Sequence, residues 1–207
     1  MTKSELLKVA KPILFNTEMV QAILDGRKTV TRRVAKFDNY ISCDEESGKY
    51  TLLEEDGGYS EGWTIQELKL NGYIKPRYRK GDILYVRETW CRNGAKYLYK
   101  AGCPNLQNNM YIKWKPSIHM PKTAARIFLK VTDVRAERLQ EITTDECRNE
   151  GCCSSDCLQT GRHSDECKCD TRFINTWNST IKKQDIDKYS WQANPWVWVY
   201  KFERVEI

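Results

Sequence analysis

The stretch Gly26-Arg27-Lys28-Thr29-Val30-Thr31-Arg32-Arg33 decides how the fold of this chain is interpreted. β-branched residues alternate in it with polar or cationic ones, which is the period of a strand with two different faces. Residues 19–24 place Met, Val, Ile and Leu side chains at helical spacing before it, and Gly26 is typical of a helix end. The sequence therefore predicts a short helix, a glycine turn and a strongly basic strand.

Cationic side chains and hydroxyls lie close together in this basic strand, at Arg27, Lys28, Thr29, Thr31, Arg32 and Arg33. Such a set suits the binding of phosphate or carboxylate through charge-assisted hydrogen bonds. The same pattern is typical of a solvated edge strand whose cations prevent pairing with other chains. The residues alone leave both interpretations open.

The rest of the chain predicts several short strands and two further helices. Strand-like runs occur at 11–15, 83–90, 97–101, 110–114, 127–134 and 194–202. Thr143 and Glu146 match a capping box, so a short helix is expected from Thr144 to about Gly151, and residues 172–182 have one apolar helical face. Aromatic residues share one face of the last strand, which is typical of a core. This mixture indicates an α+β barrel rather than a parallel sheet.

Length and composition bound the organisation. The chain has 207 residues, 40% hydrophobic and 30% charged, which excludes a disordered protein and fits a single domain over residues 1–207. Within it we expect an elaborated insertion at about residues 37–80 and a cysteine-rich loop at 152–170. The net charge of +6 permits an anionic partner. No signal-peptide pattern or long apolar stretch is seen, so a cytoplasmic protein without a membrane partner is expected.

The cysteine-rich loop has a density of thiols unusual for a surface segment. Cysteines occur at positions 152, 153, 157, 167 and 169, with His163 between them. In a reducing compartment such a cluster is read as metal ligands or free thiols rather than disulfides. We predict one structural zinc held by Cys153, Cys157, Cys167 and Cys169, with His163 as the first substitute, because Zn²⁺ takes four such ligands.

Four blocks of this sequence together resemble a known family. They are Pro12–Arg33, GDILYVRETW (81–90), WKPSIHMP (114–121) and NPWVWVYKFERV (194–205), joined by a predicted helix that ends in Glu150-Gly151. Together they resemble the ASCH family of the PUA-like superfold, and they are similar to ASCH proteins of phages and prophages. The resemblance implies a small mixed β-barrel with flanking short helices, in a bacterial cell or a phage-infected host.

The resemblance also implies a function. ASCH proteins have a cleft lined by the GRKT strand and suited to RNA or a pyrimidine nucleoside, to which Arg27, Arg32 and Arg33 would contribute cations. Some compact members hydrolyse the acyl amide of N4-acetylcytidine with a Lys, a Thr and a Glu, which correspond to Lys28, Thr31 and Glu150. This chain is about twice as long as those hydrolases. It also carries Arg32 where they have an aliphatic residue.

The segment around Glu88 and Trp90 is a second candidate for the cleft. Glu88 could pair with a strand cation or a base edge, and Trp90 could stack on a base. A core tryptophan beside a structural carboxylate is the other interpretation. The alternative function for the whole chain is a non-catalytic regulatory or protein-interaction module encoded by a phage.

Overall fold

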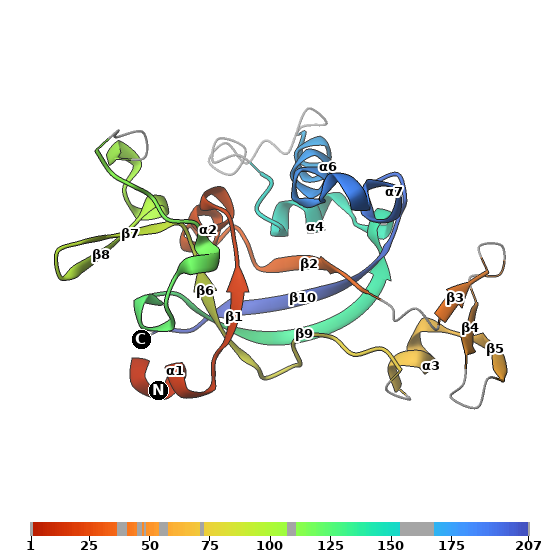
Figure 1. The fold of residues 1–207 in the computed structure, drawn as a ribbon. Coiled ribbons are helices and arrows are strands. Elements are labelled where there is room, and N and C mark those ends of the chain that lie inside the picture. Colours follow the sequence, from red (N-terminus) through yellow and green to blue (C-terminus); the bar gives the residue numbers. More distant parts are fainter. Residues whose placement is uncertain are drawn as a thin grey trace.

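The computed structural model describes residues 2–36, 41–44, 47, 49–53, 58–70, 73–106, 111–153 and 168–206. Its centre is a five-stranded mixed sheet with the order β1–β6–β9–β10–β2 (Figure 1). These strands are β1 (Lys11–Leu14), β6 (Ile83–Arg87), β9 (Phe128–Arg138), β10 (Trp196–Arg204) and β2 (Val30–Val34). The first pair is parallel and the other three are antiparallel. The α+β class is confirmed.

The expected closed barrel is not detected. β1 and β2 are the two edges of the sheet, and no ladder of backbone hydrogen bonds joins them within the described residues.

The helices are α1 (Lys3–Val9), α2 (Thr17–Leu24), α3 (Ile65–Leu70), α4 (Thr144–Asn149), α6 (Cys169–Thr180) and α7 (Ile186–Tyr189). Short 3-10 turns are η1 (Lys100–Gly102), η2 (Pro104–Leu106), η3 (Ser117–His119), η4 (Lys122–Ala124), η5 (Leu139–Glu141) and η6 (Lys183–Asp185). None of the helices in the described ranges is long and apolar enough to cross a bilayer.

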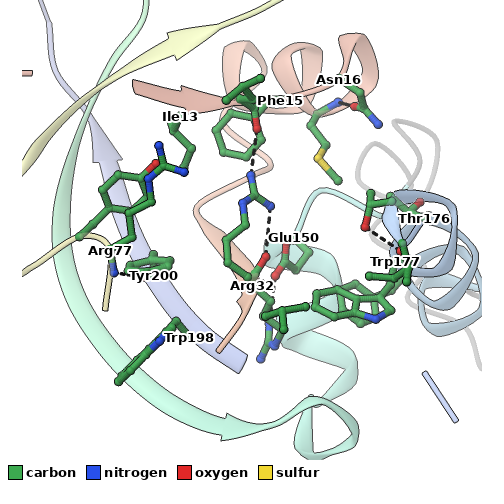
Figure 2. Close-up of a pocket in the computed structure, with 18 of the residues that line it drawn as sticks. Ile13, Phe15, Asn16, Arg32, Arg77, Glu150, Thr176, Trp177, Trp198 and Tyr200 are labelled. Atoms are coloured by element: carbon green, nitrogen blue, oxygen red, sulfur yellow. Dashed lines mark hydrogen bonds and ion pairs between the residues drawn. The ribbon is translucent and has the colours of Figure 1, made fainter. Parts of the chain in front are cut away.

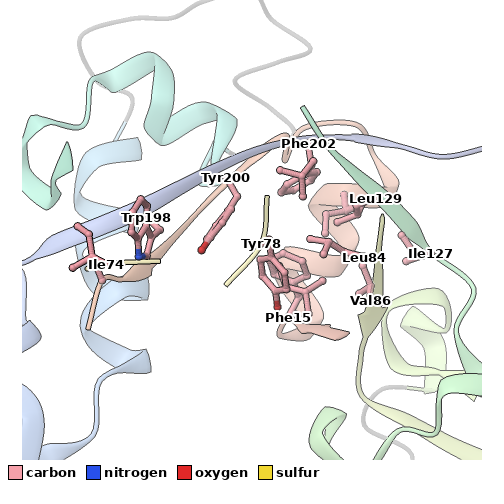
Figure 3. Packing of buried hydrophobic residues seen from close by; sticks show 14 of the residues in the cluster. Phe15, Ile74, Tyr78, Leu84, Val86, Ile127, Leu129, Trp198, Tyr200 and Phe202 are labelled. Atoms are coloured by element: carbon pink, nitrogen blue, oxygen red, sulfur yellow. The ribbon is translucent and has the colours of Figure 1, made fainter. Parts of the chain in front are cut away.

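The two faces of the sheet carry separate hydrophobic clusters. On one face Trp198, Tyr200 and Phe202 pack in the largest cluster, together with residues of β1, β6 and β9 (Figure 3). Val197 and Val199 alternate with them and pack on the other face against α6. The prediction that the aromatic face of the last strand is core is confirmed.

The basic strand begins later than predicted. β2 starts at Val30, because the backbone N–H groups of residues 27–29 are bonded to helix ends, although the carbonyl of Thr29 still accepts from Phe202 in β10. The backbone N–H groups of Arg27 and Lys28 both donate to the carbonyl of Ala22 in α2, and that of Thr29 donates to the carbonyl of Asn149. Lys28 forms an isolated bridge with Glu150. The end of α4 is thereby brought against the start of the basic strand.

The predicted insertion forms a small unit of its own. It contains β3 (Ile41–Cys43), β4 (Tyr50–Leu53), β5 (Tyr59–Trp63) and α3, which lie beyond one end of the central sheet (Figure 1). Tyr50, Leu52, Ile65 and Leu68 are buried in the main cluster. Two helices were placed well from sequence: α4 has the predicted capping box, and α6 buries Phe173 and Trp177 but begins three residues earlier, at Cys169.

A hairpin lies on the other side of the sheet. It pairs β7 (Trp90–Asn93) with β8 (Lys96–Tyr99). The strand expected at 110–114 is wrong for its described part, because residues 111–114 form no strand and only Lys115 bridges to Trp90.

Candidate functional site

Arg33 links the two edges of the central sheet. Its guanidinium donates to the carbonyl of Arg32 in β2 at 3.1 Å and to the carbonyl of Leu14 in β1 at 2.9 Å. The ring of Phe15 lies beside it, with the guanidinium carbon 5.2 Å from the ring centroid. One side chain therefore spans the place where a barrel would have a backbone ladder.

A cavity of about 720 Å³ opens at this gap (Figure 2). Its walls come from β1, β2, β10, α6 and the segment before β6. Six aromatic rings line it: Phe15, Tyr78, Phe173, Trp177, Trp198 and Tyr200. A volume of this size suits one drug-sized or nucleotide-sized ligand. Residues of both hydrophobic clusters line the cavity: Trp198 and Tyr200 belong to the main cluster, and Phe173 and Trp177 to the cluster under α6.

The charges that line the cavity are unequal. Five cations line it, Arg32, Arg33, Lys36, Lys75 and Arg77. Arg32 has carboxylate partners, but the described residues offer none of the other four a carboxylate within ion-pair distance. Glu150 is the one acidic residue among the described lining residues, and its charge is already paired. The cavity is therefore electropositive.

Glu150 and Lys28 form a buried ion pair at the cavity wall. The ammonium of Lys28 makes three hydrogen bonds, to the carboxylate Oε2 of Glu150 at 2.6 Å, to the Glu150 carbonyl at 2.8 Å and to the Val30 carbonyl at 2.9 Å. Lys28 is 2% exposed and Glu150 5%. Burial lowers the pKa of Lys28, while the neighbouring carboxylate of Glu150 opposes that shift.

Arg32 extends this pair into a network behind the strand. It contacts the other carboxylate oxygen of Glu150 at 3.2 Å, Glu137 at 2.5 Å and Glu146 at 2.7 Å, and Arg135 contacts both Glu137 and Glu146. Burial disfavours the charged form of Arg32, but the carboxylates outweigh it and raise the pKa of the guanidinium. Arg135 also lies 3.9 Å from Asp133, so Lys28, Arg32 and Arg135 all have carboxylate partners.

Gly151 allows Glu150 to reach Lys28. Its φ is +85°, in the region that favours glycine, and a Cβ there would lie 2.7 Å from the Cβ of Ala22 and 3.2 Å from the Cβ of Lys28. A side chain at this position would push the end of α4 away from α2. The close approach of Glu150 to the basic strand thus depends on a residue without a side chain.

Thr31, the predicted nucleophile, is buried but isolated. It is 1% exposed, and its hydroxyl has no hydrogen-bond partner within the described part of the chain. All three protons of the Lys28 ammonium go to other acceptors. Lys28 and Thr31 are not among the described residues that line the cavity, although Phe15 and Glu150 line it and contact Lys28.

Three other predicted site residues have contacts inside the protein. Arg27 donates to the carbonyls of Gly151 and Cys153 and pairs with Asp25. Glu88 is 1% exposed and forms a bidentate pair with Arg126, at 2.8 and 2.9 Å. Trp90 is buried in a separate hydrophobic cluster. None of the three is among the described lining residues of the cavity, so their interpretation as structural groups is the one that these contacts favour.

The predicted zinc ligands fall only partly within the described chain. Cys153 and Cys169 are buried in the cluster under α6. Cys157, Cys167 and His163 lie outside the described residues. Among the residues that are described, no group of three His, Cys, Asp or Glu side chains could hold a metal. One structural zinc stays a prediction.

Lys36, Lys75 and Arg77 were missed by sequence reasoning. They lie in or next to the insertion, outside the blocks that carry the family resemblance. The signal that could have found Lys75 and Arg77 is the basic run Lys75-Pro76-Arg77 shortly before the Gly81-Asp82 turn.

No family model, no characterised protein and no solved structure matches this chain.

Proposed function

We propose that this chain is a PUA-like ASCH protein whose cavity binds a pyrimidine base, either of RNA or of a free nucleoside. The observation that supports this most is the gap between β1 and β2, where a cavity walled by aromatic rings has the Arg33 guanidinium at its side. A PUA-like barrel opened at one seam would have the same arrangement.

The chemistry of the cavity suits a base. Aromatic faces bind bases by stacking, which contributes about 1–3 kcal/mol for each base. Arg33 uses two of its N–H groups on carbonyls and has others that could donate to a base carbonyl. An electropositive cavity also attracts a ligand that is attached to phosphate.

Binding can be measured through Trp177 and Trp198, which both line the cavity. We expect cytidine and N4-acetylcytidine to quench tryptophan fluorescence with saturation. Arg33→Gln should weaken binding roughly 10-fold, since a hydrogen bond to a charged group contributes about 1.5–3 kcal/mol. Lys201→Gln, at an exposed position of β10, is the matched control. Affinity that is the same in both variants would remove Arg33 from the site.

Hydrolysis of N4-acetylcytidine is a second function, favoured by the contact between Lys28 and Glu150. For this reaction Lys28 would have to leave its present acceptors, and as the neutral amine it would take the proton of the Thr31 hydroxyl while the hydroxyl oxygen adds to the acyl carbon. The bond from carbon to the exocyclic nitrogen of cytosine then breaks, and that nitrogen receives the proton. Water hydrolyses the acetyl-threonine to acetate. The lowered pKa of Lys28 favours the neutral amine that this step needs.

Acetate release tests this second function directly. The expected result is turnover by the wild type and loss of turnover in Lys28→Met and Thr31→Val. Thr132→Val is the matched control, because the Thr132 hydroxyl is also buried without a partner among described residues and does not belong to the proposed site. A thermal melt of each variant separates lost chemistry from lost folding. Saturable binding without any acetate would support the non-catalytic module.

A further inference from the structure

We propose that the ligand of this cavity is a nucleoside phosphate, with its base among the aromatic rings and its phosphate against Arg33, Lys36, Lys75 and Arg77. This inference rests on the proposed base site and adds the charged part of the ligand. The phosphate could belong to a free nucleotide or to an RNA strand.

The first support is the lack of compensation for these cations. Among the described residues none of these four cations has a carboxylate within ion-pair distance, whereas Arg32, the neighbour of Arg33, contacts three. Burial lowers the pKa of Arg33, the carboxylate of Glu150 opposes that shift, and the charge of Arg77 adds a smaller lowering. The Glu150 carboxylate is already paired with Lys28 and Arg32, and the guanidinium groups of Arg33 and Arg77 repel one another. Bringing like charges together at a partly buried site is unfavourable unless an anion joins them.

The second support is that Arg77 is attached to the wall. Its backbone N–H donates to the hydroxyl of Tyr200 at 3.1 Å, and its guanidinium carbon lies 5.5 Å from the ring centroid of Tyr78. The hydroxyl of Tyr78 in turn donates to the carbonyl of Pro12 at 2.5 Å. The segment before β6 is therefore bonded to both β1 and β10, which keeps its cations beside the aromatic rings.

The third support is the amount of charge. A terminal phosphate carries about −1.5 to −2 near neutral pH and accepts several hydrogen bonds, whereas a carboxylate carries a single charge. Guanidinium groups bind phosphate oxygens in a bidentate way. Two arginines and two lysines around one space therefore fit a phosphate better than a carboxylate.

The test compares ligands that differ only in phosphate. We expect cytidine 5′-monophosphate to bind about 10- to 100-fold more tightly than cytidine at low salt, with a difference that shrinks as salt is added. The triple variant Lys36→Gln, Lys75→Gln, Arg77→Gln should lose this difference and keep its affinity for cytidine. The control Lys3→Gln, Lys96→Gln, Lys201→Gln removes the same charge at exposed positions away from the cavity and should bind as the wild type does.

The outcomes separate this inference from the proposed function. Equal affinity for cytidine and its monophosphate overturns the phosphate site and leaves the base site standing. Inorganic phosphate that competes as well as the nucleotide overturns the base site instead. A cytidine oligomer with a 5′ hydroxyl distinguishes the two sources: tighter binding than the mononucleotide identifies an RNA strand, and weaker binding identifies a free nucleotide. If the control triple variant loses as much affinity as the cavity variant, the inference is rejected.

Discussion

Two sets of charges begin at neighbouring residues of β2, Arg32 and Arg33, which both line the cavity, and they differ in how they are compensated. Arg32 belongs to a network in which every cation has a carboxylate partner. In the cavity, Arg33 lies with cations that have no carboxylate partner among the described residues. A compensated set stabilises the position of the chain, whereas an uncompensated set lowers the free energy of an anionic ligand. Arg32 therefore has a structural role, and Arg33 has the ligand-binding role that we propose.

The largest test of this comparison removes each arginine in turn. Arg32→Leu leaves three carboxylates with too few cations, so the free energy of unfolding should fall by about 3–5 kcal/mol in urea denaturation. Arg33→Leu removes hydrogen bonds to two carbonyls and the contact with the Phe15 ring but no ion pair, and should cost about 1–2 kcal/mol. Adding Glu137→Gln and Glu146→Gln to Arg32→Leu leaves Lys28 and Arg135 with the two carboxylates of Glu150 and Asp133, and should recover part of the loss. Equal losses from the two single arginine variants would contradict the distinction.

The next test separates Glu150 from its partners by backbone strain. Gly151→Ala places a Cβ against Ala22 and Lys28, and we expect a loss of roughly 2–4 kcal/mol from the positive φ and the contact together. Gly94→Ala is the matched control, because Gly94 also has a positive φ but no atom within 4 Å of the added carbon. Its cost should be about 1 kcal/mol. Thermal or urea unfolding measures both, and a Gly151 variant no worse than the Gly94 variant would argue against close packing here.

A smaller effect on the free energy of unfolding is expected at alkaline pH from Tyr200, which lines the cavity. Burial raises the pKa of Tyr200 to about 12, above its ordinary value near 10. The unfolded chain then loses this proton first, so the stabilising contribution is present below pH 10 and disappears as the pH rises from about 10 to 12. Comparing urea unfolding of Tyr200→Phe with the wild type should show an advantage of the wild type that declines by about 2 kcal/mol over this range. A constant difference would mean that the phenol is not protected from water.

The smallest expected effect on the stability of the fold is that of removing zinc from the cysteine-rich loop. The cluster of cysteines predicts about one zinc ion for each chain. Elemental analysis of protein purified without added metal or chelator should find it. Chelation should expose Cys153 and Cys169 to a thiol reagent while the melting of the central sheet changes little. Protein that contains no zinc would support the interpretation as free thiols.

The sequence predicted the elements but not how the edges of the sheet meet. Local patterns gave α2 with its glycine end, the capping box of α4 and the aromatic face of β10, because each depends on neighbouring residues. The link between the two edges of the sheet depends on a contact distant in sequence, that of Arg33 with Leu14, which no local pattern predicts.

The site shows the same division. The family resemblance implied that Lys28 and Glu150 share a site, and the two residues form an ion pair. The sequence could not show that Arg32 has carboxylate partners and Arg33 has none among the described residues. Strand alternation sends neighbours to opposite faces, but which face holds the ligand is decided by tertiary packing. Lys75 and Arg77 come from a segment without a clear periodic pattern, so their place at the cavity required the folded chain.

The link through Arg33 also has a mechanical consequence. Paired strands are held about 4.8 Å apart by their backbone bonds, so a closed barrel has a nearly fixed circumference. A side chain with several rotatable bonds sets a softer limit, and the distance between β1 and β2 can change without breaking any backbone pair. A change in the distance between β1 and β2 would change the width of the cavity, which would allow it to bind flat groups of different thickness.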